Sequence, residues 1–150
     1  MKKLLFLFLL SSMSTAMVSA QGVKPKQDMI EIYDASGKFN KQIQFDYYEK
    51  VDDMPEFPGG KAGLEKYIKD NLNYPESARE AKIEGTVTIR FILSPTGNIM
   101  NIRTLDAPAG GNVLIKEAQR IVQRMPRWKP GKLEGKAVYT EIILPLQFKM

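Results

Sequence analysis

The residues of this sequence that could do chemistry are limited first by what is missing. The chain has no histidine and no cysteine, which excludes a Ser-His-Asp triad, a catalytic thiol, disulfides and most transition-metal sites. No serine is followed three positions later by lysine, and no Gly-Lys pair has the surrounding residues of a phosphate-binding loop. We therefore predict a protein that is not an enzyme, has no cofactor and takes no small-molecule substrate.

Two charged clusters remain as candidate sites. Asp52, Asp53 and Glu56 are carboxylates that could bind a hard cation, but acids beside prolines are more often a solvated linker. Arg120, Arg124 and Arg127 fall on one helical stripe. They are either an anion-binding face or a solvated helix flank that suits the negative end of the helix dipole. The net charge of +5 is mild, so we expect no nucleic-acid partner.

The single tryptophan lies in "MPRWKPGK", from Met125 to Lys132, between two prolines. A binding role would need polar groups arranged around the ring, and the sequence offers none nearby. Pro126 and Pro130 forbid continued helix, whereas a tryptophan can cover ~150–250 Å² of core surface. We interpret this segment as a packed corner between a helix and a strand.

The elements that must position these residues follow from hydrophobic periodicity. Val87, Ile89 and Phe91 alternate with polar residues, which predicts a sheet with one face in water. Gly110-Gly111-Asn112 offers an N-cap for a later helix. The predicted elements are, in chain order, a β-hairpin of Met29 to Tyr33 and Phe39 to Tyr47, a helix from Lys61, a short helix after Pro75, strands from Thr86 to Leu93 and from Ile99 to Leu105, a helix from Leu114 to Met125, and a strand from Ala137 to Phe148.

This order predicts an α+β fold, a small antiparallel three-stranded sheet with helices on one face, preceded by a β-hairpin. The first residues are excluded from it. Lys2 and Lys3 precede an apolar run, and Val18-Ser19-Ala20 supplies small residues before Gln21, the layout of a cleaved secretory signal. We divide the chain into a signal peptide (1–20), an N-terminal β-hairpin extension (21–53) and a main domain (54–150). We expect a periplasmic protein.

Several motifs carry a family resemblance. They are "PEFPGG" at Pro55, "YPESAREAKIEGTVTIRFILSPTGNI" from Tyr74, "MPRWKPGK" from Met125 and "LPLQFKM" at the end. In this order, residues 54–150 resemble the C-terminal domain of TonB-type energy transducers, and the opening and ending motifs resemble the Bacteroidetes-type branch in particular.

The resemblance implies a non-catalytic periplasmic module for outer-membrane transport. Such a module grips the short box peptide of a TonB-dependent outer-membrane receptor, which joins the last strand as an extra strand. Transferred to this sequence, the docking strand is Ala137 to Phe148, and Tyr74-Pro75 matches a motif that also meets the receptor. The expected partner-binding residues are Val138, Tyr139, Thr140, Glu141, Ile142, Ile143, Leu144, Tyr74 and Pro75.

The sequence departs from the family where force would be transmitted. The apolar run at the N-terminus is shorter than the roughly 20 residues of a spanning helix, and no long Pro-rich span follows it. Three interpretations stay open: a periplasmic binding module for a receptor or another envelope protein, an energy transducer whose uncleaved N-terminus is the membrane anchor, and a structural envelope protein that forms homodimers through the same edge strand.

Overall fold

The computed structural model describes residues 23–150. It has the following elements: β1 (Lys26–Tyr33), β2 (Phe39–Tyr47), α1 (Gly60–Asn71), α2 (Glu76–Glu80), β3 (Gly85–Leu93), β4 (Ile99–Asp106), α3 (Asn112–Gln123), β5 (Lys132–Leu133), β6 (Lys136–Ala137) and β7 (Thr140–Phe148). The predicted signal peptide lies outside the described residues. Within residues 23–150 no helix has the length and apolar character to span a bilayer.

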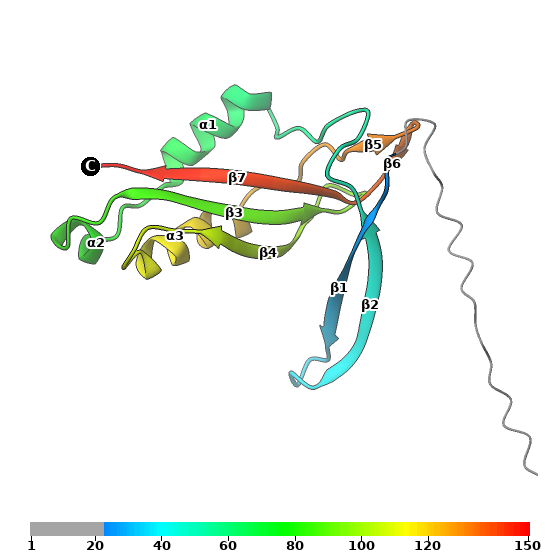
Figure 1. Ribbon diagram of the computed structural model, residues 1–150, viewed down its shortest axis with the longest axis horizontal. Coiled ribbons are helices and arrows are strands. Elements are labelled where there is room, and N and C mark those ends of the chain that lie inside the picture. The colour runs from blue at the N-terminus through cyan, green and yellow to red at the C-terminus, as the bar shows by residue number, and fades with distance from the viewer. Residues whose placement is uncertain (1–22) are drawn as a thin grey trace, which may run out of the picture.

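The main sheet has the order β4-β3-β7, and all its pairs are antiparallel. The helices pack against one face of it, and the β1–β2 hairpin projects from the end where β3 stops and β7 starts (Figure 1). The predicted α+β fold is confirmed, including the hairpin that precedes it.

Alternation along the strands explains why one face holds the core. Val87, Ile89 and Phe91 of β3 are fully buried, and so are the neighbouring side chains of Leu146 and Phe148 from β7. The helices close this face with their apolar stripes. Their core residues are Leu64, Tyr67, Ile68 and Leu72 of α1, Ala78 of α2, and Leu114, Ala118 and Val122 of α3. One apolar cluster therefore joins all three helices to the sheet.

The opposite face of the sheet differs from the prediction. The alternation predicts that Arg90 and Ile92 face water, but Arg90 is 7% exposed and Ile92 is fully buried. Phe45 and Tyr47 of the hairpin cover this end of the sheet and form a second apolar cluster with Ile92. Along β3 this face becomes exposed only towards Thr86, whereas on β7 the side chains of Ile143, Pro145 and Gln147, on the same face, are exposed. The prediction was wrong here because the covering residues lie far away in the sequence.

The corner at Trp128 is packed, as predicted. The indole is 5% exposed, and it contacts the rings of Phe57 and Phe91 edge-on at centroid distances of 5.4 and 5.7 Å. Its backbone N–H donates to the carbonyl of Gly97 at 3.0 Å. Gly97 has a φ of +81°, and a Cβ there would lie 1.9 Å from the Trp128 carbonyl oxygen. The corner thus closes against the β3–β4 turn.

The segment Gly110-Gly111-Asn112 supplies the N-cap of α3, as predicted: Gly111 is the N-cap and Asn112 the first helical residue. One local prediction needs correction. The last predicted strand starts too early, because Ala137 belongs to the short β5–β6 hairpin and β7 starts at Thr140. Glu134 and Gly135 both have positive φ, the geometry of a two-residue hairpin turn, which Glu-Gly signals less clearly than Asn-Gly.

Candidate functional site: an open sheet edge

The β7 strand forms one edge of the sheet, and that edge is regular. β7 pairs with β3 along its whole length without a shift in register. The opposite edge strand, β4, has two register shifts against β3 and a positive φ of 50° at Asn101. Bulges of this kind blunt an edge against pairing with further strands. Of the two edges of the sheet, β7 is therefore the one shaped to accept another strand.

One hydrogen bond shows which backbone N–H and C=O groups of β7 point away from β3. The N–H of Glu141 donates to the carbonyl of Tyr48 at 2.9 Å, on the side away from β3. Backbone groups in an antiparallel pair alternate between the two sides of a strand. Ile143, Pro145 and Gln147 therefore also direct their backbone N–H and C=O groups outward, except that Pro145 has no N–H. A proline costs no ladder bond at such a position.

The outer edge of β7 is divided into two parts. Tyr48 occupies the first part, because its N–H donates to the Tyr139 carbonyl at 3.0 Å and its carbonyl accepts from Glu141. We call Tyr139 to Glu141 the closed segment. Among the described residues no strand pairs with the outer side of Ile143 to Gln147, which we call the open segment. The open segment presents N–H donors at Ile143 and Gln147 and carbonyl acceptors along its length.

A groove runs beside the open segment, between β7 and α1. Its volume is about 380 Å³. It is lined by Glu65, Ile68, Lys69, Leu72, Pro145, Leu146 and Gln147. On the α1 side its lining is apolar at Ile68 and Leu72, which also pack against the core, and charged at Glu65 and Lys69. The groove therefore offers an apolar surface on the helix side of any strand that would be added to β7.

A second pocket adjoins the C-terminal end of β7 and shares Leu72 with the groove. Its volume is about 660 Å³, and it is lined by Leu72, Asn73, Tyr74, Arg79, Lys149 and Met150. The hydroxyl of Tyr74 donates to the Ile83 carbonyl at 2.5 Å, and its ring meets Phe148 edge-on at 6.1 Å. Pro75 is the N-cap of α2. The Tyr74-Pro75 motif thus lies near the open segment and not near the closed one.

The structure separates the residues that the sequence predicts for binding. Val138 and Tyr139 precede β7, and Glu141 is engaged by Tyr48 and Arg90. Thr140, Ile142 and Leu144 are on the core side of the strand. Of the predicted strand residues, only Ile143 combines an exposed side chain, 55% exposed, with outward backbone groups.

The sequence prediction did not include Pro145, Gln147, Ile68 and Leu72, which line the groove. The sequence does contain a feature that could have predicted the two β7 residues, Pro145 and Gln147. Pro145 has the same parity as Ile143, and a proline inside a strand indicates the side that faces no partner strand.

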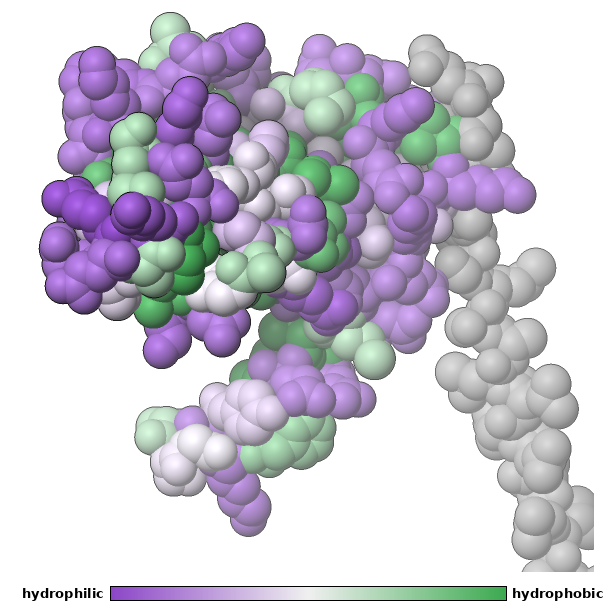
Figure 2. Space-filling model, turned by 60° about the vertical axis from the view of Figure 1, so that its left-hand side comes forward, coloured by the Kyte–Doolittle hydropathy of each residue, from purple (hydrophilic) through white to green (hydrophobic). Residues whose placement is uncertain are grey.

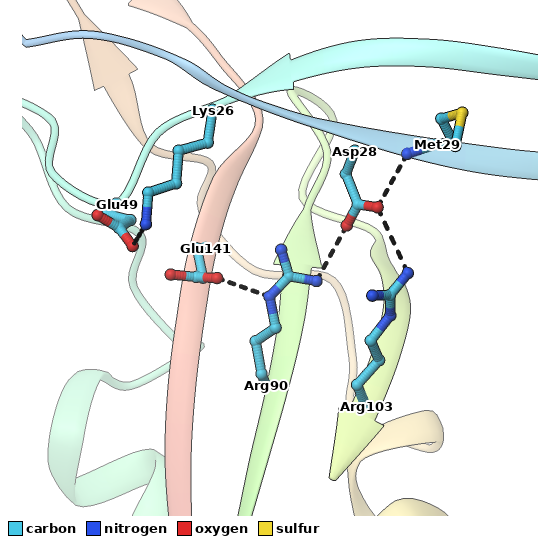
Figure 3. A network of polar contacts seen from close by, with 7 residues as sticks. All are labelled: Lys26, Asp28, Met29, Glu49, Arg90, Arg103 and Glu141. Atoms are coloured by element: carbon cyan, nitrogen blue, oxygen red, sulfur yellow. Dashed lines mark hydrogen bonds and ion pairs between the residues drawn. The ribbon is translucent and has the colours of Figure 1, made fainter. Parts of the chain in front are cut away.

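A buried ionic network connects the hairpin to β7 (Figure 3). The guanidinium of Arg90 donates from Nε to Glu141 at 2.6 Å and from Nη1 to Asp28 at 3.0 Å. It also lies 4.9 Å from the ring centroid of Tyr47. The side chains of Asp28, Arg90 and Glu141 are 12%, 9% and 10% exposed. We call these three residues the Arg90 network.

The charges in this network stabilise one another. Burial opposes the charged form of Arg90, but hydrogen bonds to Glu141 and Asp28 outweigh it and raise the pKa of the guanidinium. Burial likewise opposes the charged form of Asp28, yet the N–H of Met29 and the Arg90 guanidinium lower the pKa of its carboxyl group. The hairpin is thus fixed to the sheet by a desolvated, fully charged contact.

The two charged clusters of the sequence make structural contacts. Asp52 accepts the backbone N–H of Glu134 at 2.8 Å, and residues 53 and 56 form backbone bridges to Lys132 and Lys129. Arg120 is paired with Glu117 at 2.6 Å. No group of three or more possible metal ligands occurs within residues 23–150. The arrangement of β7, its groove and its pocket is suited to binding a peptide segment.

Comparisons with known proteins agree with this geometry. The family model described as the Gram-negative bacterial TonB protein C-terminal matches residues 70–150. The protein TonB of Escherichia coli (strain K12) is 27% identical over 85 residues, which are 57% of this chain and 34% of that protein. The match therefore spans about a third of the length of this relative. The β1–β2 hairpin lies outside the residues that the family model matches.

Proposed function

Because this chain belongs to the family of Gram-negative bacterial TonB C-terminal domains, we propose that it is a binding module that takes up a peptide segment as an additional strand on β7. The segment comes from a TonB-dependent outer-membrane receptor, in energy-coupled outer-membrane transport. We call this added segment the guest strand. The observation that carries this proposal is the open segment of β7, Ile143 to Gln147, beside the apolar groove of α1.

The guest strand would be held by two kinds of contact. Its backbone would exchange hydrogen bonds with Ile143 and Gln147 and donate one to the carbonyl of Pro145. Its side chains would alternate between the two faces of the sheet. Those opposite Leu144 and Leu146 would lie on the helix side, in the groove beside Ile68. We therefore expect a guest strand with an apolar residue at every second position.

The cellular location follows from the family and from the N-terminus. TonB-type domains work in the bacterial envelope, and we propose export to the periplasm with cleavage before Gln21. Mass spectrometry of the mature protein decides this point. A first residue at Gln21 supports export as a free module, whereas an intact Met1 identifies a membrane anchor and supports the energy transducer.

The test of peptide binding is calorimetric titration with synthetic peptides from the N-terminal segments of TonB-dependent receptors. We expect saturable binding by the wild-type protein. Ile143→Pro removes an outward N–H and should weaken binding at least tenfold, because the guest carbonyl loses its donor and the ring obstructs the edge.

The matched control is Ile143→Ala, which keeps the N–H and should bind within about threefold of wild type, since the Ile143 side chain is largely exposed. Circular dichroism establishes that both variants are folded. Equal binding by the proline and alanine variants would contradict docking on this edge, and so would the absence of any heat with a folded wild-type protein.

The same edge favours one second candidate function. An open, regular strand edge with the exposed Ile143 is also a surface on which two copies pair. Sedimentation velocity over a hundredfold range of concentration tests this homodimer. A dimer that Ile143→Pro abolishes supports self-association, and a monomer throughout the range removes it.

A further inference from the structure

The segment that follows the hairpin lies on the docking edge itself. Tyr48 is paired with Thr140 in a parallel bridge of two hydrogen bonds, to Tyr139 and from Glu141. The chain then leaves β7, since its next backbone bridge joins Asp53 to Lys132. Tyr48 therefore stands at the point where the closed segment ends and the open segment begins.

Tyr48 is held by its neighbours on both sides. Tyr47 is buried below the Arg90 guanidinium, and Glu49 forms an ion pair with Lys26. Two residues further back, Phe45 is also buried and packs on Tyr139 with ring centroids 4.7 Å apart. The hairpin stands out from the body of the protein as an arm (Figure 2), and its base is attached to the main sheet through the Phe45–Tyr47–Ile92 cluster and the Asp28–Arg90 ion pair.

Whether a guest strand would displace Tyr48 depends on the contacts that would be lost and the hydrogen bonds that would be gained. The exchange of its two hydrogen bonds for two from the guest brings no net gain. Displacing the hairpin base would expose the buried side chains of Phe45 and Tyr47, and exposing large apolar side chains to water is unfavourable. It would also separate Asp28 from Arg90, and breaking a buried ion pair is itself unfavourable. The guest strand is therefore more stable when it ends at Tyr48.

We propose that Tyr48 is a stop that fixes the length and the register of the guest strand on β7. The guest strand pairs with Ile143 to Gln147 and gains no main-chain bonds beyond Tyr48, so residues added at that end leave the affinity unchanged. This inference rests on the proposed peptide binding and adds a determinant of specificity to it. Tyr48 lies outside the residues matched by the family model, so the stop is a feature of the hairpin extension.

A disulfide lock tests the stop, and the natural chain contains no cysteine that would interfere. Tyr48 and Thr140 are Cα partners of one bridge, and neighbouring strands bring Cα atoms within the range that a disulfide requires. The variant Tyr48→Cys/Thr140→Cys is titrated with the same receptor peptide in its oxidised and reduced forms. We expect dissociation constants within twofold of each other. Oxidation that weakens binding tenfold or more would show that Tyr48 must leave the edge, and would overturn the proposal.

A measurement on the wild-type protein serves if the double variant does not fold. The Glu141 amide, which donates to Tyr48, should exchange its hydrogen at the same slow rate with and without peptide. A change in this rate of tenfold or more on binding would overturn the stop.

The titration of the double-cysteine variant also separates the two proposals. If no receptor peptide binds in either redox state while the protein is folded, the proposed function fails, and the stop fails with it. Binding that only the oxidised form lacks contradicts the stop alone.

Discussion

Replacing Pro145 with valine should strengthen peptide binding by adding one donor to the open segment. Pro145 is opposite Thr88 in the register with β3, and the alternation set by Glu141 directs its nitrogen away from β3. The substitution therefore leaves the β3–β7 ladder unchanged. The Pro145 side chain is exposed, and valine favours strand geometry. The open segment would then present three N–H groups in a row of outward positions.

The expected gain is that of one main-chain hydrogen bond. In the proposed complex with the wild-type protein, the guest carbonyl opposite Pro145 has no donor. A net intramolecular hydrogen bond contributes ~0.5–1.5 kcal/mol, and 1.4 kcal/mol is a factor of about ten in affinity. Pro145→Val should therefore bind the receptor peptide about two- to thirteenfold more tightly than wild type.

Calorimetric titration at one salt concentration and pH measures this gain. The matched control is Pro95→Val, which adds an N–H in the turn between β3 and β4, beyond the Thr140 end of β7 and not beside the open segment. It should leave the affinity unchanged. Sedimentation of Pro145→Val must accompany the titration, because a better edge also pairs with copies of itself. A folded, monomeric Pro145→Val protein with wild-type affinity would refute the assignment of outward groups on β7.

The remaining predictions concern the contacts that hold the site. Arg90→Met removes the cation paired with the buried Glu141 and leaves Asp28 with only its 3.4 Å contact to Arg103. It should lower the free energy of unfolding by ~3–5 kcal/mol, measured by urea denaturation; an unchanged midpoint contradicts the network. The pKa of Asp28 is lowered in the folded state, so the stability it contributes is present above its unfolded-state pKa and is lost as the pH falls through the folded-state value. The amide signal of Met29, whose N–H donates to the Asp28 carboxylate, should therefore change below about pH 4 when followed by NMR, and Asp28→Asn should remove this dependence. Gly97→Ala places a Cβ 1.9 Å from the carbonyl oxygen of Trp128 and should destabilise the protein by ~1–3 kcal/mol. In Gly37→Ala the Cβ meets nothing within 4 Å, and thermal unfolding should show a smaller loss; equal losses contradict the packed corner.

The fold could be predicted because its signals are local. Alternating apolar residues such as Val87 and Ile89 predict strands wherever one face is buried. Pro75 and the Ser94–Asn98 turn residues mark where elements end. Arg90 could not be placed in this way. A cation in an alternating strand indicates a face in water, and its burial depends on Asp28, 62 residues away along the chain.

The candidate site was predictable at the level of the strand but not of its parts. The last strand was predicted from its alternation and assigned as the docking strand through the family resemblance, and β7 is indeed one edge of the sheet. Its division into a closed and an open segment depends on Tyr48, whose contact with Thr140 has no signal in either local sequence. The groove depends on where α1 packs, so Ile68 and Leu72 read only as core residues until the helix is placed beside β7.

Amide hydrogen exchange of β7, followed residue by residue by NMR with and without receptor peptide, tests the central claim most directly. The account predicts that the amides of Ile143 and Gln147 exchange quickly in the free protein and become protected at least tenfold in the complex. The amides of Ile142 and Leu144, which face β3, should be protected in both states. Protection of Ile143 and Gln147 already in the free protein, or fast exchange of both in a saturated complex, would contradict it.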